Sequence, residues 1–203
     1  MLKIDFLKQE KALYAPSVVT PCWVDVPPMN FLMIDGEGDP NTSAVYKESV
    51  EALFTMSYAL KFKVKKGELA IDYGVFPLEG LWWADNMNDF KNGNRECWKW
   101  RMMIRQPDFV SGEFVAETRA EVLKKKQLEA LNLMRFGGFS EGKCAQILHK
   151  GPFSDEGPTI RRLHDFIQAS GYKLCGKHHE LYLSYIRKAA SEKWRTVIRQ
   201  GGK

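Results

Sequence analysis

The residues best suited to chemistry in this sequence lie in segment 178–184, which reads His-His-Glu-Leu-Tyr-Leu-Ser. Alternation of polar and apolar residues favours a β-strand, whose neighbouring side chains point to opposite faces. His178, Glu180, Tyr182 and Ser184 then share one face, and we expect the leucine face to meet a helix. Because a glutamate among large apolar neighbours is costly unless solvated or paired, we interpret Glu180 as a functional carboxylate on a face that no helix covers.

A second glutamate lies among aromatic residues in segment 77–83, Pro-Leu-Glu-Gly-Leu-Trp-Trp. Strand alternation groups Glu79 with Trp83 and separates both from Trp82, but it does not decide which group faces a ligand. The next strand offers Trp100 and Met102 on one face as stacking walls. Core packing is the competing interpretation of each aromatic residue. The ligand-binding residues that we predict are Glu79, Trp82, Trp83, Trp100 and Met102.

Other chemistries find little support in the residue patterns. A metalloprotease helix would need a histidine where Leu183 stands, so we predict no metal site. The glycines at 36 and 38 lack the third glycine of a dinucleotide-binding turn, so no cofactor is expected. The four cysteines are widely spaced without a Cys-x-x-Cys pair, which favours reduced thiols that fill the core.

An internal repeat is the strongest organisational feature. Residues 99–106 (KWRMMIRQ) return as residues 193–200 (KWRTVIRQ), with six identities in eight positions and an offset of 94. Comparable elements precede both copies, which indicates two related modules.

The elements that position these residues follow from hydrophobic periodicity and from helix start signals. In the first half we predict a strand at 30–35, a helix at 42–63 capped by Asp39, and strands at 72–84 and 98–106. In the second half we predict a strand at 143–149, a helix at 159–169, and strands at 178–184 and 194–200. A connecting helix or helix pair, capped by Ser111, spans 111–133.

These elements predict one α+β domain over residues 1–203. It contains two pseudo-symmetric strand-helix-strand-strand modules with antiparallel sheets, at 28–108 and 140–203, joined by a helical connector at 109–139. The modules are expected to form a shared ligand cleft.

Composition sets the broad class of protein. The chain has 203 residues, of which 44% are hydrophobic and 12% aromatic, and a net charge of +5. Because no apolar run approaches the roughly 20 residues of a membrane span and no secretory signal is present, we expect a cytoplasmic protein without a membrane partner. Lys99, Arg101 and Arg105 alternate onto one face of their predicted strand, as their copies Lys193, Arg195 and Arg199 do on theirs. Acidic residues elsewhere interrupt any continuous basic surface, so no nucleic-acid partner is expected.

Several motifs together resemble the stand-alone GyrI-like small-molecule-binding proteins, over about residues 25–200. That family has two pseudo-twofold modules with a ligand cleft between them. Its relatives serve as effector domains of multidrug-responsive regulators, where a buried glutamate recognises lipophilic cations; Glu180 matches that position. This chain has no room for the DNA-binding domain of such regulators. The motifs are residues 31–36, 38–41, 77–83, 106–107, 156–159 and 178–184.

One branch of these proteins resembles cyclopropanoid hydrolases, which open the strained ring of flat DNA-alkylating compounds and so imply xenobiotic resistance. The resemblance implies that Glu180 orients or deprotonates a water, with Tyr182 as a catalytic hydrogen-bond donor and Glu79 as a second carboxylate. Burial would raise the pKa of Glu180 above its reference of about 4.3. The alternatives are multidrug binding without chemistry and a gyrase-inhibitor-like protein-interaction module. A small aromatic or cationic ligand and a monomer or weak dimer are expected.

Overall fold

The structure is a computed structural model and describes residues 1–86, 93–184 and 189–203. Its fold is α+β, as the sequence predicts, with six α-helices and ten strands among the described residues. The chain divides into two compact units. Unit 1 comprises Met1–Phe6, Met29–Leu78 and Trp82–Phe139, and unit 2 comprises Leu7–Pro28, Glu79–Leu81 and Ser140–Lys203.

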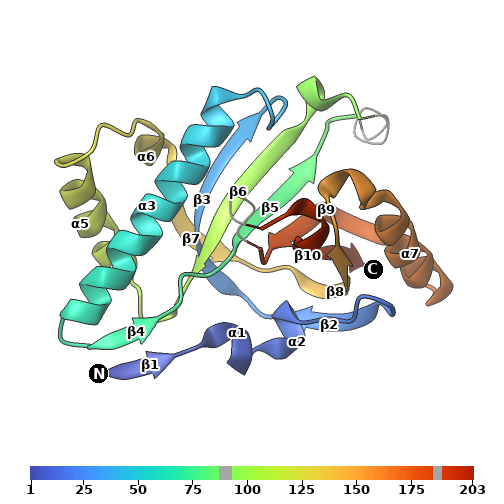
Figure 1. The fold of residues 1–203 in the computed structure, drawn as a ribbon, viewed down its shortest axis with the longest axis horizontal. Helices are drawn as coiled ribbons and strands as arrows, with labels where there is room; N and C mark the ends of the chain where they lie inside the picture. Colours follow the sequence, from blue (N-terminus) through green and yellow to red (C-terminus); the bar gives the residue numbers. More distant parts are fainter. Residues whose placement is uncertain (87–92, 185–188) are drawn as a thin grey trace. The chain divides into compact units, whose positions relative to one another are not determined.

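Unit 1 is built around the hydrogen-bonded strand order β5-β6-β3-β7, in which β3 is antiparallel to both of its neighbours. Helix α3 packs along β3 and β6, and α5 and α6 lie beside it (Figure 1). Strands β1 and β4 form a separate parallel pair. The elements are β1 (Leu2–Ile4), β3 (Met29–Glu37), α3 (Ala44–Lys66), β4 (Ile71–Tyr73), β5 (Leu78–Trp83), the 3-10 helix η1 (Arg95–Cys97), β6 (Lys99–Gln106), α5 (Gly112–Leu123), α6 (Ala130–Leu133) and β7 (Arg135–Phe139).

Unit 2 has the strand order β2-β8-β10-β9-β5, where the middle residues of β5 belong to this unit and its ends to unit 1. Helix α7 packs on β8, β9 and β10. The elements are α1 (Phe6–Gln9), which starts at the unit boundary, α2 (Lys11–Tyr14), β2 (Cys22–Val26), β8 (Gly142–Lys150), the 3-10 helices η2 (Phe153–Asp155) and η3 (Ser191–Lys193), α7 (Gly157–Ala169), β9 (Leu174–Tyr182) and β10 (Arg195–Gly202).

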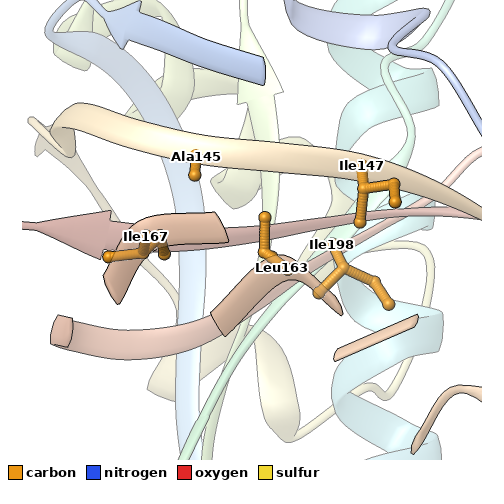
Figure 2. Packing of buried hydrophobic residues seen from close by; sticks show 5 residues of the cluster. All are labelled: Ala145, Ile147, Leu163, Ile167 and Ile198. Carbon is orange, nitrogen blue, oxygen red and sulfur yellow. The ribbon is translucent and has the colours of Figure 1, made fainter. Parts of the chain in front are cut away.

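The hydrophobic core of unit 2 forms where α7 meets the sheet. Leu163 and Ile167 of α7 pack against Ile147 of β8 and Ile198 of β10, with Ala145 beside them (Figure 2). All five side chains are fully buried. Because opposite residues of an antiparallel ladder share a face, Ile147 and Ile198 mark the helix-covered face of this sheet.

Helix capping follows the sequence in one case and departs from it in another. Ser111 caps α5 as predicted, with its hydroxyl accepting from the Phe114 amide. The cap of α3 is Ser43, whose hydroxyl accepts from the Tyr46 amide, so the prediction of Asp39 was wrong. Asp39 instead accepts from the Asn41 amide and closes the preceding turn. Two serine hydroxyls therefore fix where these helices begin.

The internal repeat is present in the hydrogen bonding, but shifted by two residues from the sequence match. The Gly38 amide donates to Trp98 O at 2.8 Å, and the Gly151 amide donates to Trp194 O at 3.0 Å. A 3-10 helix precedes each of these tryptophans, and the two helices begin 96 positions apart, at 95 and 191. Trp98, rather than Trp100, is thus the structural counterpart of Trp194.

This shift assigns different side chains to one equivalent position in the two units. Trp100 lies opposite Gly36 in unit 1, and Thr196 lies opposite His149 in unit 2. Trp100 is fully buried and makes an edge contact with Tyr46 of α3. A large indole therefore fills, under α3, the position that a small hydroxyl side chain holds in unit 2.

Replacing Gly36 with alanine should destabilise the protein because a Cβ there would lie 2.2 Å from the Trp100 ring. Overpacking of this kind costs about 1–3 kcal/mol. Urea denaturation would measure the loss. The matched control is Gly138→Ala in β7, where a Cβ meets nothing within 4 Å. Equal stability of the two variants would contradict the packing of Trp100 on Gly36.

Candidate functional site in unit 2

Glu180 is held on β9 by the residues two positions away on either side. His178 Nε2 lies 2.8 Å from Glu180 Oε1, and the Tyr182 hydroxyl donates to Oε2 at 2.8 Å. All three side chains share one face of the strand, as the alternation predicts. The Glu180 side chain is 14% exposed, and both of its carboxylate oxygens are hydrogen-bonded by its neighbours.

The face that carries Glu180 is the one that α7 covers. Glu180 lies directly opposite Ile198, which packs against Leu163 of α7. Leu181 lies opposite Val197 on the other face. The prediction that the leucine face meets the helix was therefore wrong. Glu180 sits on the helix side of the sheet, where the first residues of α7 can contact it.

Glu156, at the N-cap of α7, is the residue that supplies this contact, and sequence reasoning missed it as a site residue. It is 4% exposed. Burial, together with the charge of Glu180, raises the pKa of Glu156 to about 9. Glu156 is therefore a neutral acid near pH 7, and its proton is available for a hydrogen bond with Glu180. Its signal in the sequence was an acid immediately before the Gly-Pro start of a helix.

The pKa of Glu180 moves the opposite way from our expectation. Burial acts to raise it, but the hydrogen bond and positive charge of His178, with hydrogen bonds from Tyr182 and Glu156, lower it. The expected increase was wrong because these donors outweigh the loss of solvation. Glu180 is the ionised member of the pair and Glu156 the protonated one.

Aromatic side chains adjoin this carboxyl pair. The Phe153 ring makes an edge contact with Tyr182 at 5.6 Å and lies 4.9 Å from the Trp194 ring. Phe153 is 38% exposed. An exposed ring next to an ionised carboxylate offers both parts of a site for an aromatic cation.

Glu79 does not join Glu180. Its Oε2 lies 3.0 Å from His179 Nε2, and His179 Nδ1 lies 2.9 Å from Glu141 Oε2. Since His179 and Glu180 are adjacent on β9, their side chains point to opposite faces. Glu79 is fully buried and belongs to a separate ionic cluster of Glu79, His179, Glu141 and Arg199.

The ionic cluster is balanced in charge. Burial alone would lower the pKa of His179, but the charge of Glu141, with hydrogen bonds from His179 to Glu141 and Glu79, raises it to about 9. Burial also opposes ionisation of Glu141, yet the charges of His179 and Arg199 lower its pKa. Arg199 donates to Gln146 and to the Leu13 carbonyl. The cluster thus ties β9, β8 and β10 to helix α2.

The other predicted ligand-binding residues lie in unit 1. Trp100 and Met102 are fully buried, and Trp82 is 5% exposed. The Trp82 ring packs between the rings of Tyr46 and Trp98, with centroid distances of 6.0 Å and 5.9 Å. Trp83 is half-buried. These contacts are those of core packing, the competing interpretation. A role for the four residues in ligand binding stays a prediction, as does the shared cleft.

Four basic residues of the repeat are paired or packed within the fold, whereas Lys193 and Arg195 are exposed. Arg199 belongs to the buried cluster, Arg105 lies over the Phe76 ring, and Arg101 pairs with Asp35. Lys99 pairs with Asp85.

The cysteines and the acidic groups define no further centre in the described ranges. All four thiols are free; Cys144 is buried as predicted, but Cys22 and Cys97 are exposed, so they do not fill the core. Across residues 1–86, 93–184 and 189–203, no cluster of three or more His, Cys, Asp or Glu side chains is suited to hold a metal ion. Within the same ranges, no helix has the length and apolar character needed to cross a bilayer.

Comparison with known proteins agrees with an α+β small-molecule-binding fold. The model of the GyrI-like small molecule binding domain matches residues 21–199. This chain belongs to the GyrI-like family. No curated protein matches it in sequence.

Solved structures place close relatives in Listeria innocua. An uncharacterized conserved protein from that organism is 38% identical with a TM-score of 0.90, covering 98% of this chain and 100% of its own. A protein described as a hydrolase is also 38% identical, with a TM-score of 0.88 and coverage of 99% and 100%. The EcmrR C-terminal domain shares the fold at 14% identity and a TM-score of 0.57, over 91% of this chain and 97% of that domain.

Charge balance in the ionic cluster can be tested by a double-mutant cycle. His179→Gln leaves Glu79 and Glu141 buried against a single cation, so we expect a loss of about 3–5 kcal/mol in the free energy of unfolding. Adding Glu141→Gln removes the excess negative charge. The double variant should then lose at least about 1 kcal/mol less than the sum of the single losses, measured by urea denaturation at pH 7. Additive losses would contradict the charge assignment.

Proposed function

We propose that this protein binds small planar aromatic or cationic compounds through the ionised carboxylate of Glu180. The observation that carries the proposal is the state of this side chain, which is charged, held by His178 and Tyr182, and partly exposed. Membership of a small-molecule-binding family supports the same conclusion.

The surroundings of Glu180 suit an aromatic cation in particular. Tyr182 donates to the carboxylate, its ring adjoins the exposed Phe153, and Phe153 in turn contacts Trp194. A flat cation would gain dispersion and cation–π contacts from the rings and a Coulombic contact from Glu180. This arrangement favours multidrug binding, because flat rings and a single charge recognise planar cations in general rather than one particular compound.

Hydrolysis of a cyclopropanoid compound is the chemical function that we propose for the same site. Two Listeria innocua relatives at 37% and 38% identity are described as hydrolases. Glu180 would orient a water toward the ring methylene. As the water oxygen bonds to that carbon, one ring C–C bond breaks and its electron pair passes to the conjugated system. Glu180 accepts the proton that the water loses and then returns it to solvent, and the conjugated system takes up one proton from solvent, so the net change is the addition of one water.

The lowered pKa of Glu180 limits what it contributes as a base. A carboxylate stabilised by three donors removes a proton weakly, so its main effect is to hold the water and to stabilise positive charge. Strain in a three-membered ring supplies much of the driving force. A modest catalyst of this kind suffices only for strained substrates, which favours cyclopropanes over ordinary esters or amides.

The physiological setting that we propose is xenobiotic resistance in the cytoplasm, by a monomer or weak dimer that needs no nucleic acid, membrane or cofactor. The alternatives are sequestration of the ligand without chemistry and a gyrase-inhibitor-like interaction with a protein partner. Product analysis separates the first from hydrolysis. Loss of Glu180 would leave a protein-interaction function intact.

Glu180→Gln should weaken binding of planar aromatic cations by about 10-fold to 100-fold, since a charge-assisted contact is worth roughly 1.5–3 kcal/mol. Binding of neutral planar aromatics should change by less than about 3-fold, because the ring contacts remain. Quenching of tryptophan fluorescence measures both affinities, with Trp194 near the site. Mass analysis of each bound cyclopropanoid shows whether one water has been added and whether the variant abolishes that addition.

The matched control is Asp25→Asn in β2, which removes one exposed carboxylate of unit 2 on a strand that does not pair with β9. It should bind and react as the wild type does. Equal cation affinity in Glu180→Gln and wild type would overturn the proposed binding role. Undiminished turnover by Glu180→Gln would overturn the hydrolytic role alone.

A further inference from the structure

Helix α3 of unit 1 carries an exposed row of aromatic side chains. Phe54, Tyr58 and Phe62 follow at intervals of four residues, so they lie along one side of the helix. Neighbouring rings stack at 6.5 Å and 6.3 Å between centroids. Tyr58 is 47% exposed and Phe62 48% exposed, whereas Phe54 is half-buried. We call these three residues the aromatic row.

The aromatic row is distinct from the surfaces that α3 uses inside unit 1. The core face presents Leu53, Met56 and Leu60, which are fully buried. The side toward α5 carries Lys63, whose ammonium lies 2.9 Å from Glu121. An exposed aromatic ladder has no part in either contact, and large exposed apolar patches commonly mark interaction sites.

The charges at the two ends of the row have opposite sign. Glu51 is exposed three residues before Phe54, and Lys65 lies three residues after Phe62. Lys65 and Lys61 share the carboxylate of Asp72, at 2.7 Å and 3.4 Å. Two ammonium groups against one carboxylate leave a net positive charge at this end of the helix.

The row and its charges are arranged symmetrically about Tyr58. Phe54 and Phe62 lie four residues on either side, and Glu51 and Lys65 lie seven residues on either side. When two identical helices pack antiparallel about a shared centre, residues equally distant from that centre face each other. An antiparallel pair centred on Tyr58 therefore sets Phe54 against Phe62 and Glu51 against Lys65, each contact occurring twice.

We propose that the aromatic row is a self-association surface, and that its occupant is α3 of a second copy of this chain in antiparallel orientation. Charge complementarity selects this occupant, because the same surface carries both members of each ion pair. The proposal does not depend on the function proposed for Glu180.

The contact is small, so the dimer is weak. Helix α3 has 23 residues, about 35 Å at 1.5 Å per residue, and only its central turns carry the row. One helix pair buries less than the roughly 1,200 Å² typical of stable complexes. We expect a dissociation constant of about 10–100 μM, in the range of weak association.

Sedimentation velocity over a range of protein concentrations tests the surface. Tyr58→Glu places two carboxylates together at the centre and should raise the dissociation constant at least about 10-fold. The control is Val45→Glu, which changes a residue of α3 that is 49% exposed and lies outside the row. It should leave association unchanged. A wild type that stays monomeric at about 1 mM, or equal effects of the two variants, would overturn the proposal.

A charge-swap experiment tests the orientation. Glu51→Lys alone sets lysine against Lys65, and Lys65→Glu alone sets glutamate against Glu51, so each variant should associate less than the wild type. An equimolar mixture restores opposite charges at both contacts and should form heterodimers, detected by native mass spectrometry. Circular dichroism confirms that each variant is folded. A mixture that associates no better than its components would overturn the antiparallel arrangement.

Discussion

A single proton shared by two buried carboxyl groups is the constraint on which the unit 2 site depends. Glu156 and Glu180 cannot both be ionised so close together in a poorly solvated setting. Helix α7 must therefore begin where Glu156 meets β9, and β9 must carry donors on both sides of Glu180. The result is an ionised carboxylate that is oriented before any ligand arrives, next to an acid that keeps its proton.

Because side chains alternate between the two faces of β9, this one strand supplies residues to two separate sets of charged groups. His178, Glu180 and Tyr182 face α7, while His179 points to the opposite face and joins Glu79 and Glu141. In the second set Glu79 and His179 are buried and Glu141 is 9% exposed, as expected of charges that stabilise structure rather than meet a ligand. Unit 1 has the same hydrogen-bond framework between its strands as unit 2. In unit 1, however, Trp100 fills the position that Thr196 holds in unit 2.

Local patterns predicted β3, β6, β8, β9, β10 and the larger helices, because hydrophobic periodicity reports directly on backbone geometry. They missed β1, β2 and β7, and the single strand predicted at 72–84 was wrong, since β4 and β5 are separate strands in different sheets. The face assignment failed because alternation separates two faces but does not say which one a helix covers; that depends on Ile198 and Leu163, which are distant in sequence. Glu156 was missed for the same reason. The repeat was matched two residues out of register because six identities align Trp100 with Trp194 in the sequence. The hydrogen bonds of Gly38 and Gly151 and the two 3-10 helices instead align Trp98 with Trp194.

The most direct test of the shared proton is a carbon-13 NMR titration of the glutamate side-chain carboxyls, with Glu156→Gln and Glu180→Gln used to assign the two signals. Since the titration belongs to the pair, two separated steps are expected. Glu180 should ionise below the ordinary glutamate pKa, and Glu156 should stay protonated at pH 7 and lose its proton near pH 9. Both signals titrating together between about pH 4 and 5, as free glutamates do, would contradict this account of the site.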